Sequence, residues 1–274
     1  MNSKHNVPKI LNEIVVYLKQ VKLIAEESVG GEGRAGSLKD EQNVVALIKA
    51  HDKFGPLVVS HEDAFPEKIK ITKRISNKVK KEKKKKSEAR KVGDLLVRDP
   101  VTGLICVINI KTTSGSSDNA FSKLGLLIAL TDIPLSDLPN TIDWDKWTEL
   151  VYKHKANVPG RDYWYLVLDK TDMSHIVIRG AKQINTWRPN PSNDLQISWK
   201  EEWSMPPADC SFDEAFDKIL NGLKICKAKM ALKTLALIYK DNPKLLKQAE
   251  AHLTSIIPKR KKKSINLDVT LFAE

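Results

Sequence analysis

The chain has no long hydrophobic run and few cysteines or histidines. No apolar stretch is long enough to span a bilayer, and the N-terminal segment MNSKHNVPK lacks the hydrophobic stretch of a signal peptide. The three cysteines are too few and too scattered for a disulfide framework or a zinc site. The six histidines show no HxxxH or HExxH spacing. We therefore expect a cytoplasmic protein that is not a zinc hydrolase.

The motif GxxxxGK[ST] is absent, and the one match to GxGxxG, residues 31–36 (GEGRAG), follows a predicted helix where a dinucleotide-binding turn follows a strand. A P-loop or a Rossmann turn that holds a nucleotide is therefore not indicated. What the chain does have is an ordinary globular composition, with 41% hydrophobic and 29% charged residues over 274 positions. A chain of this length buries a full core, and we expect one domain over residues 1–274.

The positive charge is concentrated in two segments. The net charge is +12, and residues 78–91 contribute nine Lys or Arg against two Glu, while residues 259–263 (KRKKK) contribute five more. These segments account for the whole excess, since +7 and +5 sum to +12. Such runs are typical of solvated loops, of arms that neutralise nucleic-acid phosphates, or of nuclear-localisation signals, and composition leaves these alternatives open.

Helical periodicity and strand-like runs alternate in blocks along the chain. Helices are expected at residues 10–26, from Ser37 by a capping box, and at 121–130, 144–155 and 211–257; strands are expected at 93–98, 104–111, 163–169 and 175–180, and a loop at 189–194. This order predicts an α/β fold of the mixed α+β kind, with a central mixed sheet flanked by helices.

A hairpin is predicted in VGDLLVRDPVTGLICVINIK, because Asp99-Pro100 and Gly103 separate two apolar runs. If Arg98 and Leu104 flank the turn, Asp94 faces Ile108, and a slip of one residue brings it opposite Asn109. Either register allows the side chains of Asp94, Asn109 and Lys111 to converge at one end of the hairpin.

This set of groups suits a particular chemistry. A carboxylate from Asp94, an amide oxygen from Asn109 and the main-chain carbonyl of Ile110 are the oxygen ligands that Mg²⁺ prefers. Lys111 adds a cation beside them. Phosphodiester hydrolysis needs both a metal that activates water and positive charge near the phosphate.

The segments GDLLVRD and LICVINIK resemble the PD-(D/E)xK nuclease motif, and NIKTTSGSSDNAFSKLG is similar to the motif strand and following loop of type II restriction endonucleases. The resemblance covers about Gly93 to Gly125. It implies a restriction-endonuclease-like fold and a prokaryotic, homodimeric enzyme that cuts double-stranded DNA with Mg²⁺. It assigns Asp94 to the first acid of the motif, Asn109 to the second position and Lys111 to the lysine.

The sequence departs from that motif at two positions. Gly93 stands in place of proline, and Asn109 stands in place of an acid, which removes one negative charge from the metal site. A carboxylate from a helix would compensate, and Glu41 is the first candidate, with Glu32 second.

The resemblance also predicts where DNA binds. Thr112 and Thr113 lie where such enzymes approach the scissile phosphate. The predicted DNA-contacting residues are Thr112, Thr113, Ser114, Ser116, Asn119, Lys123, Lys84 and Lys85.

Other interpretations of the hairpin stay open. Lys111 also fits the end of an edge strand, where lysine prevents unwanted pairing. The protein could then be a basic nucleic-acid-binding protein without catalysis, and a repair or structure-specific nuclease on the same core is a third alternative.

Overall fold

The computed structural model describes residues 7–23, 33–64, 92–113, 119–120, 122–139, 142–190 and 194–241, with four further residues between 244 and 251. The chain divides into two compact units, one made of Met1–Thr186 with Ile197–Asp217 and the other of Trp187–Gln196 with Lys218–Glu274. The larger unit contains the whole predicted hairpin. We predicted a single restriction-endonuclease-like domain over residues 1–274, and this stays a prediction.

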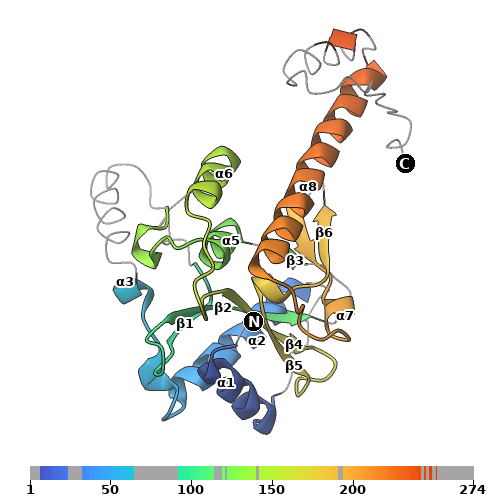
Figure 1. Ribbon diagram of the computed structural model, residues 1–274. Helices are drawn as coiled ribbons and strands as arrows, with labels where there is room; N and C mark the ends of the chain where they lie inside the picture. The colour runs from blue at the N-terminus through green and yellow to red at the C-terminus, as the bar shows by residue number, and fades with distance from the viewer. Residues whose placement is uncertain are drawn as a thin grey trace, which may run out of the picture. The chain divides into compact units, whose positions relative to one another are not determined.

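A four-stranded mixed sheet is the centre of the larger unit (Figure 1). Its strands lie in the order β1-β2-β4-β5, with β1 and β2 antiparallel, β2 and β4 parallel, and β4 and β5 antiparallel. The strands are β1 (Leu95–Arg98), β2 (Ile105–Thr113), β4 (Tyr163–Asp169) and β5 (Ile176–Gly180). The predicted mixed sheet with a hairpin is confirmed; its assignment to the restriction-endonuclease fold remains a prediction.

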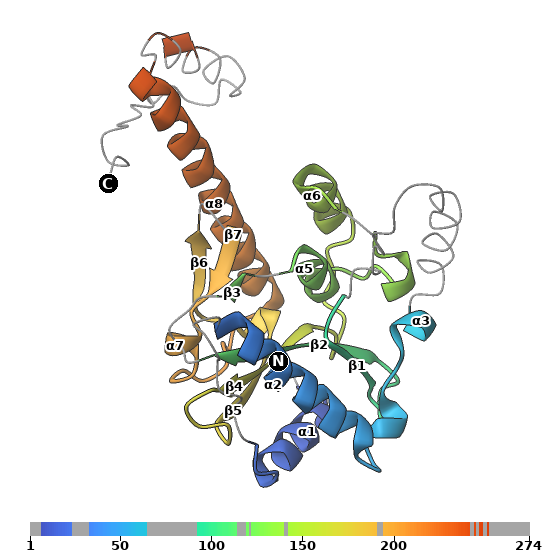
Figure 2. The ribbon, with the colours of Figure 1, turned by 180° about the vertical axis from the view of Figure 1, so that it is seen from behind.

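Helices cover both faces of this sheet. Figures 1 and 2 show α1 and α2 on one face and α5 and α6 on the other. These helices are α1 (Lys9–Gln20), α2 (Gly33–Ala50), α5 (Lys123–Leu130) and α6 (Trp144–Lys153). The short elements of the unit are η2 (Gly55–Leu57), α3 (His61–Ala64), β3 (Asn119–Ala120), η3 (Leu135–Asp137), η4 (Ala181–Gln183) and α7 (Trp199–Glu202).

The alternation of side chains along β2 explains its packing. Cys106, Ile108 and Ile110 are buried in one cluster with residues of α1 and α2, including Val44 and Ile48. Strand β4 has partners on both sides and helices on both faces, so six of its seven residues, YWYLVL, are buried. A continuous apolar run is typical of such a central strand. The polar residues of β2 lie toward its C-terminal end, and they are Asn109, Lys111, Thr112 and Thr113.

The turn of the hairpin fixes the register. Asp99 N–H donates to the Leu104 carbonyl (2.8 Å), and Gly103, at φ 73°, lets the chain reverse between them. Arg98 therefore pairs with Ile105 and Leu95 with Ile108. The register is the slipped alternative, because Asp99 and Leu104 close the loop in place of Arg98 and Leu104.

Helix α2 corrects the predicted boundary at Ser37. The helix begins at Gly33, and Asp40, predicted to complete a capping box, lies inside it with 1% of its surface exposed. The Asp40 carboxylate lies 4.0 Å from the Lys170 ammonium. The prediction failed because Arg34 and Ala35 are good helix formers, and a helical glycine costs only about 1 kcal/mol relative to alanine.

The smaller unit contains two strands that overlap the ends of the loop predicted for residues 189–194, while residues 191–193 lie outside the described residues. The strands are β6 (Trp187–Asn190) and most of β7 (Asp194–Ile197), and the two are paired. The longest described helix, α8 (Phe212–Asp241), starts in the larger unit and continues in this one. Gly222 of α8 allows close packing, since a Cβ there would lie 2.8 Å from the Leu195 side chain. Strands this short have too few residues to show an alternating pattern.

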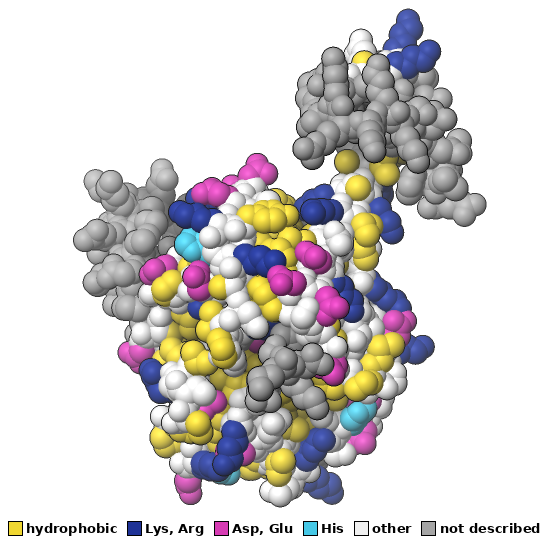
Figure 3. All heavy atoms as spheres, viewed as in Figure 1, with side chains coloured by type: hydrophobic (Ala, Val, Ile, Leu, Met, Phe, Trp, Pro, Cys, Tyr) yellow, Lys and Arg dark blue, Asp and Glu magenta, His cyan; other side chains and the backbone are white. Residues whose placement is uncertain are grey.

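The described surface carries both signs of charge. Figure 3 shows Lys and Arg side chains interspersed with Asp and Glu side chains on the visible face. The two basic segments, 78–91 and 259–263, lie outside the described residues. None of the helices that the structure describes is long and apolar enough to cross a membrane.

Candidate active site

Asp94 lies immediately before β1, at the edge where β2 continues past it. Its N–H donates to the Ile108 carbonyl (2.9 Å), and its Oδ2 accepts a hydrogen bond from the Ile110 N–H (2.8 Å). The Asp94 carboxylate therefore accepts the hydrogen bond that a main-chain carbonyl would accept if β1 continued beside β2. It is partly exposed, and it is not turned into the hydrophobic core.

The main chain of β2 adds an oxygen at the same edge. Residues two apart in a strand direct their peptide groups to the same side. Because the Ile108 carbonyl and the Ile110 N–H both bond to Asp94, the Ile110 carbonyl faces that edge as well. Two of the predicted metal ligands, Asp94 and Ile110, are thus adjacent.

Lys111 meets the predicted helix carboxylate. Its Nζ lies 3.3 Å from Glu41 Oε1, although the two residues are 70 positions apart in the chain. The side chains are 27% and 14% exposed, so both keep part of their surface in water. Of the two candidate carboxylates, the structure brings Glu41 to Lys111, whereas Glu32 lies outside the described residues.

The surroundings of Glu41 disfavour its ionised form. Burial raises the pKa of the Glu41 carboxyl above its usual value, the Lys111 ammonium opposes this, and the charge on Asp94 raises it again. Desolvation and a nearby like charge both disfavour an ionised carboxylate. A cation placed between Asp94 and Glu41 would relieve both costs.

The oxygen donors fit a hard divalent ion. Within the described parts of the chain, no three or more His, Cys, Asp or Glu side chains cluster in a way suited to a metal. A cation at this edge would therefore have two carboxylates, Asp94 and Glu41, with the Ile110 carbonyl and water completing its shell. Mg²⁺ is commonly bound by one or two carboxylates and retains several waters.

Asn109 has a different partner. Its side chain and that of Ser122 are hydrogen bonded to the Tyr163 hydroxyl, and burial raises the pKa of that phenol. Tyr163 packs under α5, where a Cβ on Gly125 would lie 2.7 Å from the ring. The carboxamide predicted to bind metal is thus held by the covered face of the sheet, and Glu41 supplies the second carboxylate in its place.

The residues predicted to contact DNA differ in their exposure to solvent. Thr112 and Thr113 are only 6% and 5% exposed, because β2 is covered on both faces, and this burial does not support their predicted contact with a phosphate. Lys123 is partly exposed, with its ammonium 4.5 Å from the Trp144 ring centroid. Asn119 forms part of β3, but its side chain is not described. Ser114, Ser116, Lys84 and Lys85 lie outside the described residues.

A cavity of about 290 Å³ opens beside the carboxylates. It is lined by Leu38, Glu41, Gln42, Val45, Lys49, His61 and Asp94. Lys49 and His61 were not among the predicted site residues. Lys49 follows Glu41 by eight residues, a spacing that keeps it near the same helix face, so helical periodicity offered a signal. His61 had none.

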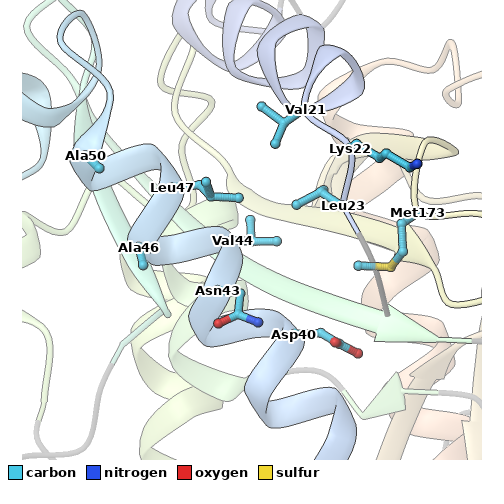
Figure 4. Close-up of a pocket in the computed structure, with 10 residues that line it drawn as sticks. All are labelled: Val21, Lys22, Leu23, Asp40, Asn43, Val44, Ala46, Leu47, Ala50 and Met173. Carbon is cyan, nitrogen blue, oxygen red and sulfur yellow. The ribbon is translucent and has the colours of Figure 1, made fainter. Parts of the chain in front are cut away.

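A larger cavity of about 500 Å³ lies against a different face of α2 (Figure 4). Among the ten residues that line it, Asp40 is the only carboxylate, and most of the others, such as Val44, Leu47 and Met173, are apolar. It therefore lacks the paired carboxylates found on the Glu41 face.

Comparison with known proteins adds no assignment: no protein-family model matches the chain, and no curated protein matches it significantly.

Proposed function

We propose that this protein is a Mg²⁺-dependent endonuclease that hydrolyses phosphodiester bonds of double-stranded DNA, of the type II restriction kind. The observation that supports this most is the meeting of Asp94, Lys111 and Glu41, which come from the hairpin and from a helix more than 50 residues earlier in the chain. The sequence pattern had grouped Asp94 and Lys111 with Asn109, and Glu41 was the first of two candidates for an additional carboxylate. A lysine at the end of an edge strand needs no such carboxylate partners.

The residues divide the work as follows. Asp94, Glu41 and the Ile110 carbonyl would hold Mg²⁺, which, when bound, polarises the scissile phosphate and acidifies water. Glu41 also keeps the Lys111 ammonium in position through their 3.3 Å contact. Lys111 orients the attacking water and balances the charge that develops on the phosphate oxygens. Asn109, which is hydrogen bonded to Tyr163, takes no part in this proposal.

The proposed setting follows from the same assignment. A duplex target has two strands, and a two-fold symmetric dimer places one site on each strand. We therefore propose a homodimer that acts in the cytoplasm of a prokaryote, with the lysine-rich segments 78–91 and 259–263 neutralising DNA phosphates.

The test is cleavage of supercoiled plasmid DNA with Mg²⁺ or with EDTA. Wild-type protein is expected to cut only with Mg²⁺, and Asp94→Asn and Lys111→Met to lower the rate at least about 100-fold, as expected for loss of a group that stabilises the transition state. Lys146→Met is the matched control, because Lys146 forms an exposed pair with Glu149 far from the site in sequence.

Three results would decide between the candidates. Discrete fragments from a plasmid favour restriction, and cutting without sequence preference favours a repair nuclease. DNA binding with no Mg²⁺-dependent cleavage would favour the non-catalytic alternative. Full activity of Lys111→Met would remove Lys111 from the mechanism.

A further inference from the structure

The cavity beside Glu41 continues past the proposed metal position. A second cavity of about 370 Å³ is lined by Gly55, Val58 to His61 and Asp94 to Leu96, and it also includes Lys49. The two cavities share Lys49, His61 and Asp94. The groove therefore leads from the paired carboxylates to two nitrogen-bearing side chains that the proposed reaction does not use.

Lys49 supplies a positive charge in this groove. It lies eight residues after Glu41 on α2, which is about 12 Å along the helix axis. Lys49 is exposed and lines both cavities, and it forms no ion pair with any residue that the structure describes. Lys111, by contrast, is paired with Glu41. The Lys49 charge is therefore available to a ligand.

His61 is held in place by the edge of the sheet. Val58 forms an antiparallel bridge with Val97, and the Val59 N–H donates to the Leu96 carbonyl (2.9 Å). His61 Nε2 lies 3.0 Å from the Gly93 carbonyl. A carbonyl only accepts hydrogen bonds, so Nε2 carries a hydrogen, and the ring is fixed beside the residue before Asp94. A phosphate would meet Nδ1, which donates a hydrogen bond when the ring is in its imidazolium form.

We infer that Lys49 and His61 form a second phosphate-binding subsite, which holds the phosphodiester group next to the scissile one on the same DNA strand. This inference rests on the proposed function, since it takes the strand cut at Asp94 to continue along the groove. Successive nucleotides advance about 3.4 Å along the duplex axis, so a strand whose phosphate meets Asp94 brings a neighbour within reach of the long Lys49 side chain. The bond to the Gly93 carbonyl holds the His61 ring at the wall of the groove.

The chemistry of the groove favours this ligand over a small neutral one. Asp94 and Glu41 at one end require a cation, and beyond them an ammonium and an imidazole face the same space. A nucleic-acid strand supplies what each end needs, because its scissile phosphate shares the cation and its neighbouring phosphate meets the ammonium. Lysine is a common point-charge partner for phosphate.

The experiment measures binding of a fluorescein-labelled duplex of arbitrary sequence, with Ca²⁺ in place of Mg²⁺, over a range of salt concentrations. Each phosphate contact contributes about 0.9 to the slope of log K against log[salt]. Lys49→Gln is expected to lower that slope by about 0.9 and to weaken binding about eightfold at about 0.1 M salt. His61→Gln, which keeps a donor for Gly93, is expected to weaken binding about fivefold.

Lys39→Gln is the matched control, because Lys39 is exposed on the same helix but lines neither cavity. If Lys39→Gln and Lys49→Gln lower the slope equally, or if neither does, the subsite does not exist. Cleavage by wild-type protein with Mg²⁺ is scored separately. If the wild type cuts DNA but Lys49→Gln leaves the salt slope unchanged, the subsite alone is overturned. If the slope depends on Lys49 but the wild type does not cut, the nuclease function alone is overturned. If the wild type neither binds nor cuts DNA, both proposals are overturned.

Discussion

Replacing Glu41 by glutamine separates the role of this residue in the fold from its role in the site. Gln is nearly the same shape as Glu but has no charge. The contact with Lys111 is 3.3 Å long and partly exposed, so its loss costs no more than about 1 kcal/mol. Burial disfavours the ionised Glu41, as its raised pKa indicates, and a neutral side chain avoids that cost. We therefore expect the free energy of unfolding to change by less than about 1 kcal/mol.

The effect on cation binding is expected to be much larger. A carboxylate and a divalent ion about 4 Å apart attract with about 8 kcal/mol at an effective dielectric constant of about 20, before desolvation is counted. If about a third of that survives, Glu41→Gln weakens cation affinity about 100-fold. Asp94 and the Ile110 carbonyl remain, so some binding persists.

The assay combines calorimetric titration with Ca²⁺, thermal unfolding without metal, and plasmid cleavage with Mg²⁺. Glu149→Gln is the control, because it breaks another Lys–Glu contact, of 2.9 Å, on the exposed surface of α6. The expected result is an unchanged melting temperature for both variants, with cation affinity and cleavage lost in Glu41→Gln alone.

Wild-type cation affinity in Glu41→Gln would refute the reasoning, since it would mean that the carboxylate serves only Lys111. A large drop in melting temperature would refute the other half, because it would show that the ion pair stabilises the fold.

Two further predictions follow from the same geometry. The pKa of Glu41 is raised, mainly by burial, so protons compete with a cation at higher pH than for an ordinary glutamate. The Ca²⁺ affinity of the wild type is therefore expected to fall as the pH is lowered from about 7.5 to about 5.5. Titration calorimetry at each pH is expected to show a smaller fall for Glu41→Gln. Equal pH dependence in both proteins would contradict this. Asp99→Ala removes the buried carboxylate whose Oδ1 accepts a hydrogen bond from the Val101 N–H (2.8 Å) in the hairpin turn, and urea unfolding is expected to show a free energy of unfolding lower by about 1–3 kcal/mol. Asp99→Asn keeps the acceptor oxygen and is expected to lose less stability. Equal stability of all three proteins would contradict the role given to the turn.

Much of the local structure was determined by the sequence alone. The hairpin followed from Asp99-Pro100 and Gly103 between two apolar runs, and the buried strand Tyr163–Asp169 from its unbroken hydrophobic sequence. The hairpin and strand predictions succeeded because turns and side-chain alternation depend on residues that are neighbours in the chain. The hairpin pattern also grouped Asp94, Asn109 and Lys111 as a candidate site, and that grouping stays a prediction.

The tertiary structure decided which of those groups meet. Periodicity could place Glu41 on a helix but could not bring that helix to Lys111, and it could not tell that Tyr163 would take the Asn109 carboxamide. Nor could it put His61 beside the Gly93 carbonyl. Contacts between residues far apart in the chain depend on how helices pack on a sheet, and the sequence pattern of each element specifies only the face that it buries.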